Sequence, residues 1–183
     1  MLWNSYLVCG PNMDCTLRLN FAGVNVLDQA WEEMKAREKH WDKRFLQLAE
    51  IVSSWSKDPS TQTGAVITDD LNRVISVGFN GFPIGVKDHK ERYENRELKY
   101  KMIVHCEMNA ILFAKGGCEN CTLYTYPLLS CSRCAASVIQ AGITRCVAPK
   151  LDPESPLGKR WSEELELSLL MFKESGVEIT LLD

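Results

Sequence analysis

The sequence predicts an α/β fold in which helices cover both faces of a sheet. After residue 105, segments with the 3.6-residue period of helices alternate with short β-branched stretches. Strands and helices of this length that alternate along a chain form a sheet whose parallel strands are joined by right-handed crossovers. With 183 residues, of which 45% are hydrophobic and 25% charged, the chain has the composition of one ordinary globular domain.

The pattern divides the chain near residue 35. Residues 1–34 show no sustained period of 2 or 3.6, so we expect a loosely docked, poorly ordered extension, followed by one domain over residues 35–183. From Ala36 onward, apolar residues recur at helical spacing until Asp58 and Pro59 stop the run. This pattern predicts an amphipathic helix that faces the core, with Trp41, Phe45, Leu48, Val52 and Trp55 on its apolar side.

After this helix, the sequence predicts a hairpin, then a loop, and then helices that alternate with strands. Two β-branched stretches, 63–68 and 73–79, flank a polar turn and predict a β-hairpin. Residues 86–101 carry charges of both signs without a period, and we expect a solvated loop there. The remaining predicted elements are helix 105–116, strand 122–126, helix 131–141, strand 144–148, a helix through Trp161, Leu165, Leu169 and Phe172, and a strand through Val177, Ile179 and Leu181.

The overall charge and hydropathy exclude two classes of partner. Lys and Arg total 21 against 24 Asp and Glu, a formal charge of −3, which provides no strong positive field for a nucleic-acid backbone. No run approaches the roughly 18 apolar residues that a membrane span requires, and no secretion signal is recognisable. We therefore expect a cytoplasmic protein with neither a nucleic-acid partner nor a membrane partner.

The cysteines are concentrated in the second half of the chain. In a chain of this size without a secretion signal, free thiols or metal ligands are favoured over disulfides. The eight are Cys9, Cys15, Cys106, Cys118, Cys121, Cys131, Cys134 and Cys146.

Two short motifs indicate a metal centre. His105 and Glu107 lie two residues apart at the start of one predicted helix, and Cys131 and Cys134 lie three apart at the start of the next. An imidazole and two thiolates are good zinc ligands, and three protein ligands leave a fourth position for water, as in catalytic zinc sites. Helix N-termini stabilise thiolate charge. Glu107 is not required as a ligand, so it could act as a general base and acid.

A second metal arrangement stays open. Cys118 and Cys121 precede Cys131 and Cys134, and four thiolates could form a closed structural zinc site. The strand predicted between the two pairs would hold them apart, which favours the arrangement with His105.

Four ordered blocks resemble the deoxycytidylate deaminase family over about residues 38–182. A His-x-Glu motif followed by Cys-x-x-Cys is the signature of zinc-dependent nucleobase deaminases. The blocks that carry the resemblance are Ser56–Val66, Gly78–Pro83, His105–Ile111 and Cys131–Ile143.

The resemblance implies a three-layer α/β/α cytidine-deaminase-like fold with a five-stranded mixed sheet. It also implies hydrolysis of deoxycytidine monophosphate (dCMP), a small-molecule nucleotide, to deoxyuridine monophosphate (dUMP) and ammonia, with one catalytic Zn²⁺ per chain. Further implications are a homo-oligomer between dimer and hexamer, and regulation by deoxycytidine and thymidine triphosphates. Carried over by position, the zinc ligands are His105, Cys131 and Cys134, the proton shuttle is Glu107, and the nucleoside contacts are Asn80 and Ala65.

The chain departs from the family pattern at two positions beside the motifs. Cys106 replaces the usual Ala between the His and the Glu, and we interpret it as a small packing residue that points away from the metal. Ser130 replaces the Pro before the first cysteine, which alters the loop at the base pocket. A cytidine nucleoside, a purine base or a tRNA adenosine therefore stays open as substrate, and so does a non-catalytic structural zinc module.

Two further questions stay open at the substrate site. Asn80 could serve only as a turn residue, since asparagine is common in tight turns. Phosphate recognition has six candidates that the sequence does not separate: Lys87, Lys90, Arg92, Arg96, Lys99 and Lys101.

Overall fold

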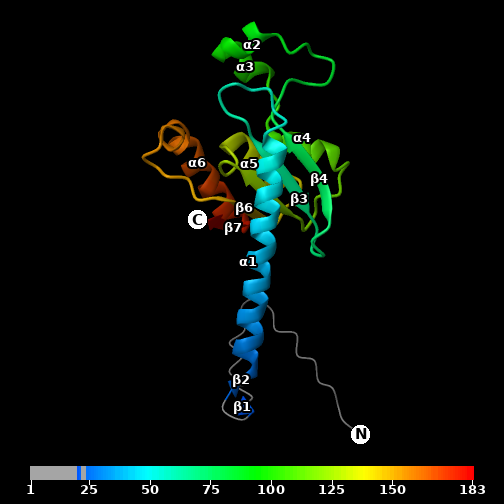
Figure 1. Ribbon diagram of the computed structural model, residues 1–183, viewed down its shortest axis with the longest axis vertical. Helices are drawn as coiled ribbons and strands as arrows, with labels where there is room; N and C mark the ends of the chain where they lie inside the picture. Colours follow the sequence, from blue (N-terminus) through cyan, green and yellow to red (C-terminus); the bar gives the residue numbers. More distant parts are fainter. Residues whose placement is uncertain (1–19, 22–23) are drawn as a thin grey trace. The chain divides into compact units, whose positions relative to one another are not determined.

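The structure is a computed structural model that describes residues 20–21 and 24–183 (Figure 1). The chain divides into two compact units, one up to Lys39 and one over His40–Asp183. In the first unit, β1 (Asn20–Phe21) pairs antiparallel with β2 (Val24–Asn25). What was predicted for residues 1–19 and 22–23 lies outside the described residues.

Helix α1 (Val26–Ser53) crosses the division between the units and begins earlier than Ala36, where the sequence pattern predicts it to start. Residues 28–36 are all exposed, including Trp31 and Met34, so the apolar residues that recur there at helical spacing do not mark a buried face. Hydrogen bonds between side chains one turn apart stabilise this part of the helix; for example, Gln29 Nε2 donates to Glu33 Oε1 at 3.2 Å. Because α1 ends at Ser53, Trp55 lies in the following turn, 51% exposed, and the prediction that it faces the core was wrong.

The second unit contains a five-stranded mixed sheet, which confirms the predicted fold class. The strands lie in the order β4-β3-β5-β6-β7, with β3 antiparallel to both neighbours and β5, β6 and β7 parallel. The bounds of the strands are β3 (Gly64–Thr68), β4 (Val74–Phe79), β5 (Thr122–Tyr126), β6 (Arg145–Pro149) and β7 (Glu178–Leu182).

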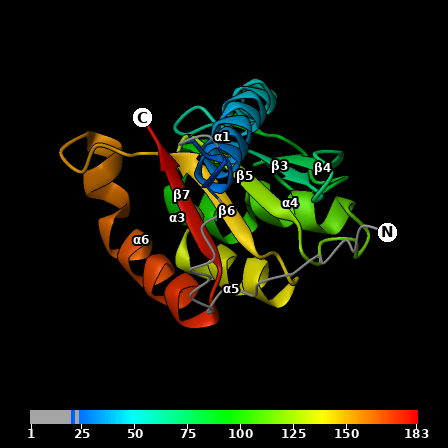
Figure 2. The ribbon, with the colours of Figure 1, turned by 90° about the horizontal axis from the view of Figure 1, so that it is seen from below.

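Helices cover both faces of this sheet, as Figure 2 shows. One face packs against α4 (Cys106–Phe113), α5 (Ser132–Gln140) and α6 (Pro156–Ser175), and the core there includes Ala65, Ile67, Leu123, Val138 and Phe172. The other face packs against the part of α1 that follows His40, through Phe45, Ala49, Val52, Val66, Tyr124 and Val147. Side chains of a strand alternate between faces, so each central strand contributes to both cores.

Two glycines allow helices to pack directly on the hairpin. A Cβ on Gly64 would lie 2.1 Å from the carbonyl oxygen of Ala49 in α1. A Cβ on Gly78 would lie 2.3 Å from the carbonyl oxygen of Cys106 and 2.4 Å from the backbone nitrogen of Ala110, both in α4. Any larger residue would push α4 away from β4, so Gly78 helps to set the position of the helix that carries Glu107.

The prediction of a solvated loop over residues 86–101 was wrong. The segment folds into α2 (Lys90–Glu94) and α3 (Arg96–Met102), and Asn95 caps α3 by accepting a hydrogen bond from Leu98 N at 3.0 Å. Both helices are too short to show a period, and Lys99 is buried through a pairing with a residue far away in sequence.

The buried face of α6 also differs from the predicted one. Phe172 is buried, but Leu169 is exposed and Ser168 is buried in its place. Because an α-helix has 3.6 residues per turn, the residues that face the core are separated by three positions in some turns and by four in others. None of the helices in the described part of the chain is long and apolar enough to cross a membrane.

Candidate metal centre and active site

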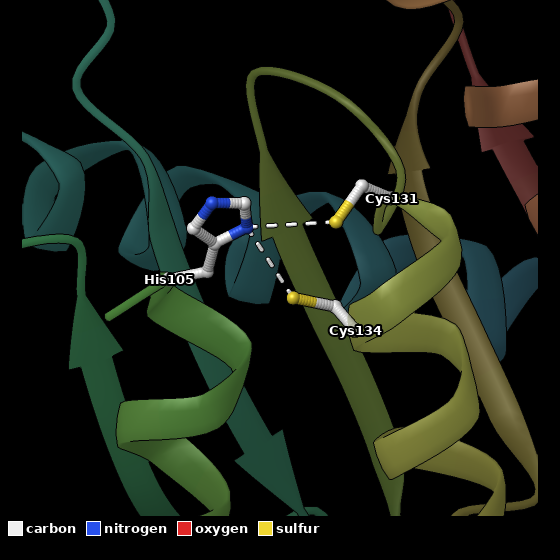
Figure 3. Close-up of side chains that lie close together, drawn as sticks. All are labelled: His105, Cys131 and Cys134. Atoms are coloured by element: carbon white, nitrogen blue, oxygen red, sulfur yellow. Dashed lines mark hydrogen bonds between the residues drawn. The ribbon is translucent and has the colours of Figure 1, made fainter. Parts of the chain in front are cut away.

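Two helix starts bring three metal-binding side chains together. His105 is the N-cap residue of α4, Cys131 is the N-cap residue of α5, and Cys134 lies in the first turn of α5. Figure 3 shows the imidazole of His105 facing both sulfur atoms. Its Nδ1 lies 3.5 Å from Cys131 Sγ and 3.4 Å from Cys134 Sγ.

The donor set fits a tetrahedral zinc ion. Bonds of about 2.3 Å to sulfur and about 2.0 Å to nitrogen, at a tetrahedral angle, separate the two donors by about 3.5 Å. Both sulfur-to-nitrogen distances match this value, and all three donor atoms lie within 4.8 Å of one another. Within the described residues no other group of three or more such donors forms. Cys118 and Cys121 belong to the buried core instead, so the alternative with four thiolates is not formed.

The protonation of the three donors also suits a divalent metal. A hydrogen bond from the Cys134 thiol lowers the pKa of Cys131 despite its burial, and His105 adds to this effect. The same pairing, together with burial, raises the pKa of Cys134. The hydrogen bond with Cys131 raises the pKa of His105 although burial opposes it. Protons on Cys134 and His105 are those that a metal ion would displace on binding.

Glu107 lies in a cavity that His105 and Cys131 also line. The carboxylate is 5% exposed, and Cys106 donates a hydrogen bond to its Oε2 at 3.2 Å. Cys106 also lines the cavity, so it does more than fill space in the core. We call this space the site cavity; it is lined by Asp58, Ser60, Thr61, Thr63, Asn80, Lys99, Tyr100, Ile103, His105, Cys106, Glu107, Leu128, Leu129, Cys131, Arg160 and Trp161.

A hydrogen-bonded network builds the polar wall of the site cavity. Asn80 accepts from Thr63 N at 2.8 Å and donates to Thr61 O at 2.9 Å. Its amide therefore fixes the turn before β3, and Asn80 also lines the cavity. Ala65 is fully buried in the core and does not line the cavity, whereas Thr63 does. Contacts of Asn80 and Ala65 with a nucleoside stay predictions.

Lys99 closes this network from α3. Its ammonium lies 3.1 Å from Asp58 Oδ1 and also donates to the hydroxyl of Ser60. Burial alone would raise the pKa of Asp58, but the Ser60 N–H, the Ser60 hydroxyl and Lys99 together lower it below its ordinary value. Charged and polar groups are thus held in fixed positions on this wall.

A second depression, which we call the arginine hollow, adjoins the site cavity. It is lined by Arg96, Tyr100, His105, Cys131, Arg133, Arg160, Trp161 and Glu164. Of the six basic candidates for phosphate recognition, only Arg96 and Lys99 line either space.

Sequence reasoning missed several residues of these two spaces, among them Arg133, Arg160 and Trp161. Arg133 lies between the two cysteines of the motif, and this position was the signal that could have found it. Arg160 and Trp161 lie outside the recognised motifs, and Trp161 was interpreted as a core residue.

The comparison with known families agrees with this geometry. Residues 39–150 match the family described as cytidine and deoxycytidylate deaminase zinc-binding region. The chain belongs to this deaminase family. All three donors, Glu107 and Asn80 lie inside the matched residues, whereas Arg160 and Trp161 lie beyond them.

Individual relatives of this deaminase-family chain cover most of its length. It is 49% identical over 142 residues to an uncharacterized deaminase in the luxG 3′ region of Aliivibrio fischeri, which covers 76% of this chain and 92% of that protein. It is 33% identical over 143 residues to the deoxycytidylate deaminase of Mus musculus, covering 75% and 76%. Its fold is similar to that of dCMP deaminase from the cyanophage S-TIM5 in complex with dCMP and dUMP, with a TM-score of 0.58 and 19% identity over 76% of this chain and 95% of that one.

Proposed function

We propose that the protein catalyses the zinc-dependent hydrolytic deamination of dCMP to dUMP and ammonia. The observation that carries the proposal is the position of the Glu107 carboxylate, which is buried in the same cavity as His105 and Cys131. A structural zinc site has no use for a carboxylate at this place. Family membership and the deoxycytidylate deaminases among the relatives support the substrate.

One catalytic Zn²⁺ would be held by His105, Cys131 and Cys134. The two N-terminal helix ends beneath these residues stabilise the thiolate charge. When bound, zinc supplies Lewis acidity that makes a water molecule nucleophilic near neutral pH.

Glu107 moves the protons of the reaction. Its carboxylate accepts a proton from the attacking water and delivers it to N3 of cytosine, which makes C4 electrophilic. As the C4–O bond forms and the C4–N bond breaks, Glu107 carries a second proton to the exocyclic nitrogen, which leaves as ammonia. The hydrogen bond from Cys106 holds Oε2 in place, so the carboxylate keeps its orientation through both transfers.

The arginine hollow favours a phosphorylated substrate over a nucleoside. Arg96, Arg133 and Arg160 come from three helices and surround a space beside the site cavity. Guanidinium groups bind phosphate with paired, charge-assisted hydrogen bonds. A cytosine base in the site cavity would place a 5′-phosphate within reach of these groups, while Asn80 contacts the nucleoside.

Three finer inferences rest on the family resemblance. They are a homo-oligomer between dimer and hexamer, control by deoxycytidine and thymidine triphosphates, and a cytoplasmic location. Gel filtration with and without the triphosphates tests the first two.

Turnover of cytosine compounds tests the proposed function directly. Zinc-loaded protein is assayed by ultraviolet absorbance with deoxycytidine, dCMP and dCTP, and with cytidine and adenine as competing classes. We expect selective turnover of dCMP. Glu107→Gln should lose about 10²- to 10⁴-fold in rate while it retains its zinc, because the carboxylate is not a ligand. A wild-type protein that binds zinc but converts no dCMP would refute the proposal.

A further inference from the structure

Trp161 has a buried hydrogen-bond donor that nothing in the described chain satisfies. Its indole Nε1 is covered by protein atoms and has no partner. Buried polar groups in folded proteins are almost always paired, and an unpaired one costs free energy. The buried hydroxyls that also lack a partner, on Thr125, Ser130 and Ser168, line neither the site cavity nor the arginine hollow. Trp161 lines both.

The indole lies where the two spaces meet. Its ring is edge-on to the imidazole of His105, with centroids 6.4 Å apart and an interplanar angle of 80°. On one side it borders the cavity that contains Glu107, and on the other it borders the arginine hollow. A nucleotide with its base in the first space and its phosphate in the second must pass Trp161.

The chemistry of the arginine hollow identifies the acceptor that Trp161 lacks. Indole and guanidinium groups only donate hydrogen bonds. Oε2 of Glu164 accepts from the backbone N–H of Ser132 at 3.3 Å and from its hydroxyl. The hollow is lined by three arginines and an indole against this one carboxylate, so it is rich in donors and carries more positive than negative side chains. A phosphate monoester, which offers only acceptors and carries negative charge, complements this set.

We propose that Trp161 is a specificity-determining, substrate-binding residue whose Nε1–H donates a hydrogen bond to a 5′-phosphate oxygen of the nucleotide. The proposal rests on the proposed function and assigns to α6 a role in telling nucleotides from nucleosides. Because the nitrogen is covered in this structure, the indole shifts when the nucleotide enters.

Trp161→Phe removes the donor and retains an aromatic ring beside His105. Because the five-membered ring is lost with the N–H group, the comparison of dCMP with deoxycytidine separates the loss of the donor from the loss of packing. For dCMP, kcat/KM should fall about 10- to 100-fold, the effect of one hydrogen bond to a charged group. For deoxycytidine, which has no phosphate, the slow turnover should change by less than about twofold. The matched control is Trp55→Phe, since Trp55 packs against Phe79 and lines neither space.

Nuclear magnetic resonance gives a readout that does not depend on activity. The chain has five tryptophans, so the indole N–H signal of Trp161 can be assigned by its loss in Trp161→Phe. When dUMP is added to wild-type zinc-loaded protein, this signal should move downfield as the hydrogen bond forms. The indole signal of Trp55 should stay in place.

The outcomes separate this inference from the proposed function. If wild-type protein neither converts dCMP nor binds dUMP, the proposed function fails. If it does both while Trp161→Phe behaves like wild type and the indole signal is unmoved by dUMP, the inference about Trp161 alone is overturned. Equal losses for dCMP and deoxycytidine would likewise overturn it, because the ring rather than a phosphate contact would then matter. Should Trp161→Phe fold poorly, the wild-type spectrum decides by itself.

Discussion

Lys99→Met should lower the free energy of unfolding by about 3 kcal/mol. Removing one partner of a buried ion pair costs about 3–5 kcal/mol, because the other charge remains in the protein without compensation. The side chains of Lys99 and Asp58 are 6% and 4% exposed, so solvent does not screen the pair. Asp58 retains its hydrogen bonds from Ser60 N and Ser60 Oγ, each at 2.9 Å, which places the loss at the lower end of that range.

Urea unfolding, followed by circular dichroism, measures this loss. For a chain of this length about 3 kcal/mol corresponds to a decrease of about 6–12 °C in melting temperature. Lys101→Met is the matched control, since Lys101 lies on the same helix and is exposed. Combining Lys99→Met with Asp58→Asn should restore part of the stability by removing the unpaired charge. A Lys99→Met protein within about 0.5 kcal/mol of wild type would refute the reasoning.

The same pair predicts how the loss depends on pH. The folded-state pKa of Asp58 lies below its ordinary value of 3.8, so its contribution is present above about pH 4 and is lost as the pH falls through the folded-state pKa. Without Lys99, two of the influences that lower the pKa of Asp58 are lost, so the variant binds a proton at higher pH than wild type does. The destabilisation by Lys99→Met should therefore be smaller at pH 4 than at pH 7. A loss of unfolding free energy that is larger at pH 4 than at pH 7 would contradict this prediction.

Three further predictions concern packing and the metal. Gly78→Ala should destabilise the protein by about 1–3 kcal/mol and reduce turnover, because the methyl group meets the backbone of α4. Gly81→Ala, where a Cβ has open space, is its control, and equal effects of the two changes would contradict the argument. Phe172→Ala should cost about 3–5 kcal/mol in urea unfolding, since Phe172 is fully buried, and a loss below about 1 kcal/mol would speak against a close-packed site. Removing zinc with a chelator should abolish turnover and lower the melting temperature, both reversibly on adding zinc; an unchanged melting temperature would count against a metal held by two helices.

The sequence was sufficient to predict the metal centre because its geometry is local. His105 and Glu107 share one helix start, and Cys131 and Cys134 share another, so the chain spacing determines which side chains lie together within each pair, while the packing of α4 beside α5 brings the two pairs together. Strand β5 was predicted with the bounds that the structure has, since a β-branched run between turns is a local signal too. Helices on both faces of a sheet followed from the alternation of such elements, whereas the five-stranded mixed sheet was expected from the family resemblance.

The remainder of the site depends on contacts between residues far apart in sequence. Lys99 and Asp58 are separated by 41 positions, and nothing near Lys99 indicates that its charge is buried. Arg160 and Trp161 reach the site from α6, where a Trp at helical spacing is typical of any core-facing helix. Side chains of this kind are recognised only when the packing of the elements is known.

The two residues that begin α4 and α5 have a consequence for the evolution and engineering of this chain. His105 and Cys131 occupy N-cap positions, yet neither makes a side-chain capping hydrogen bond. Serine, asparagine and aspartate are the residues that best stabilise such positions, by about 1 kcal/mol relative to a side chain that does not cap. In the metal-free chain, Cys131→Ser or His105→Asp would therefore stabilise a helix start, but both changes would remove a metal donor and with it the stability that bound zinc supplies. At these two helix starts the side chain that best caps the helix and the side chain that binds the metal are different residues.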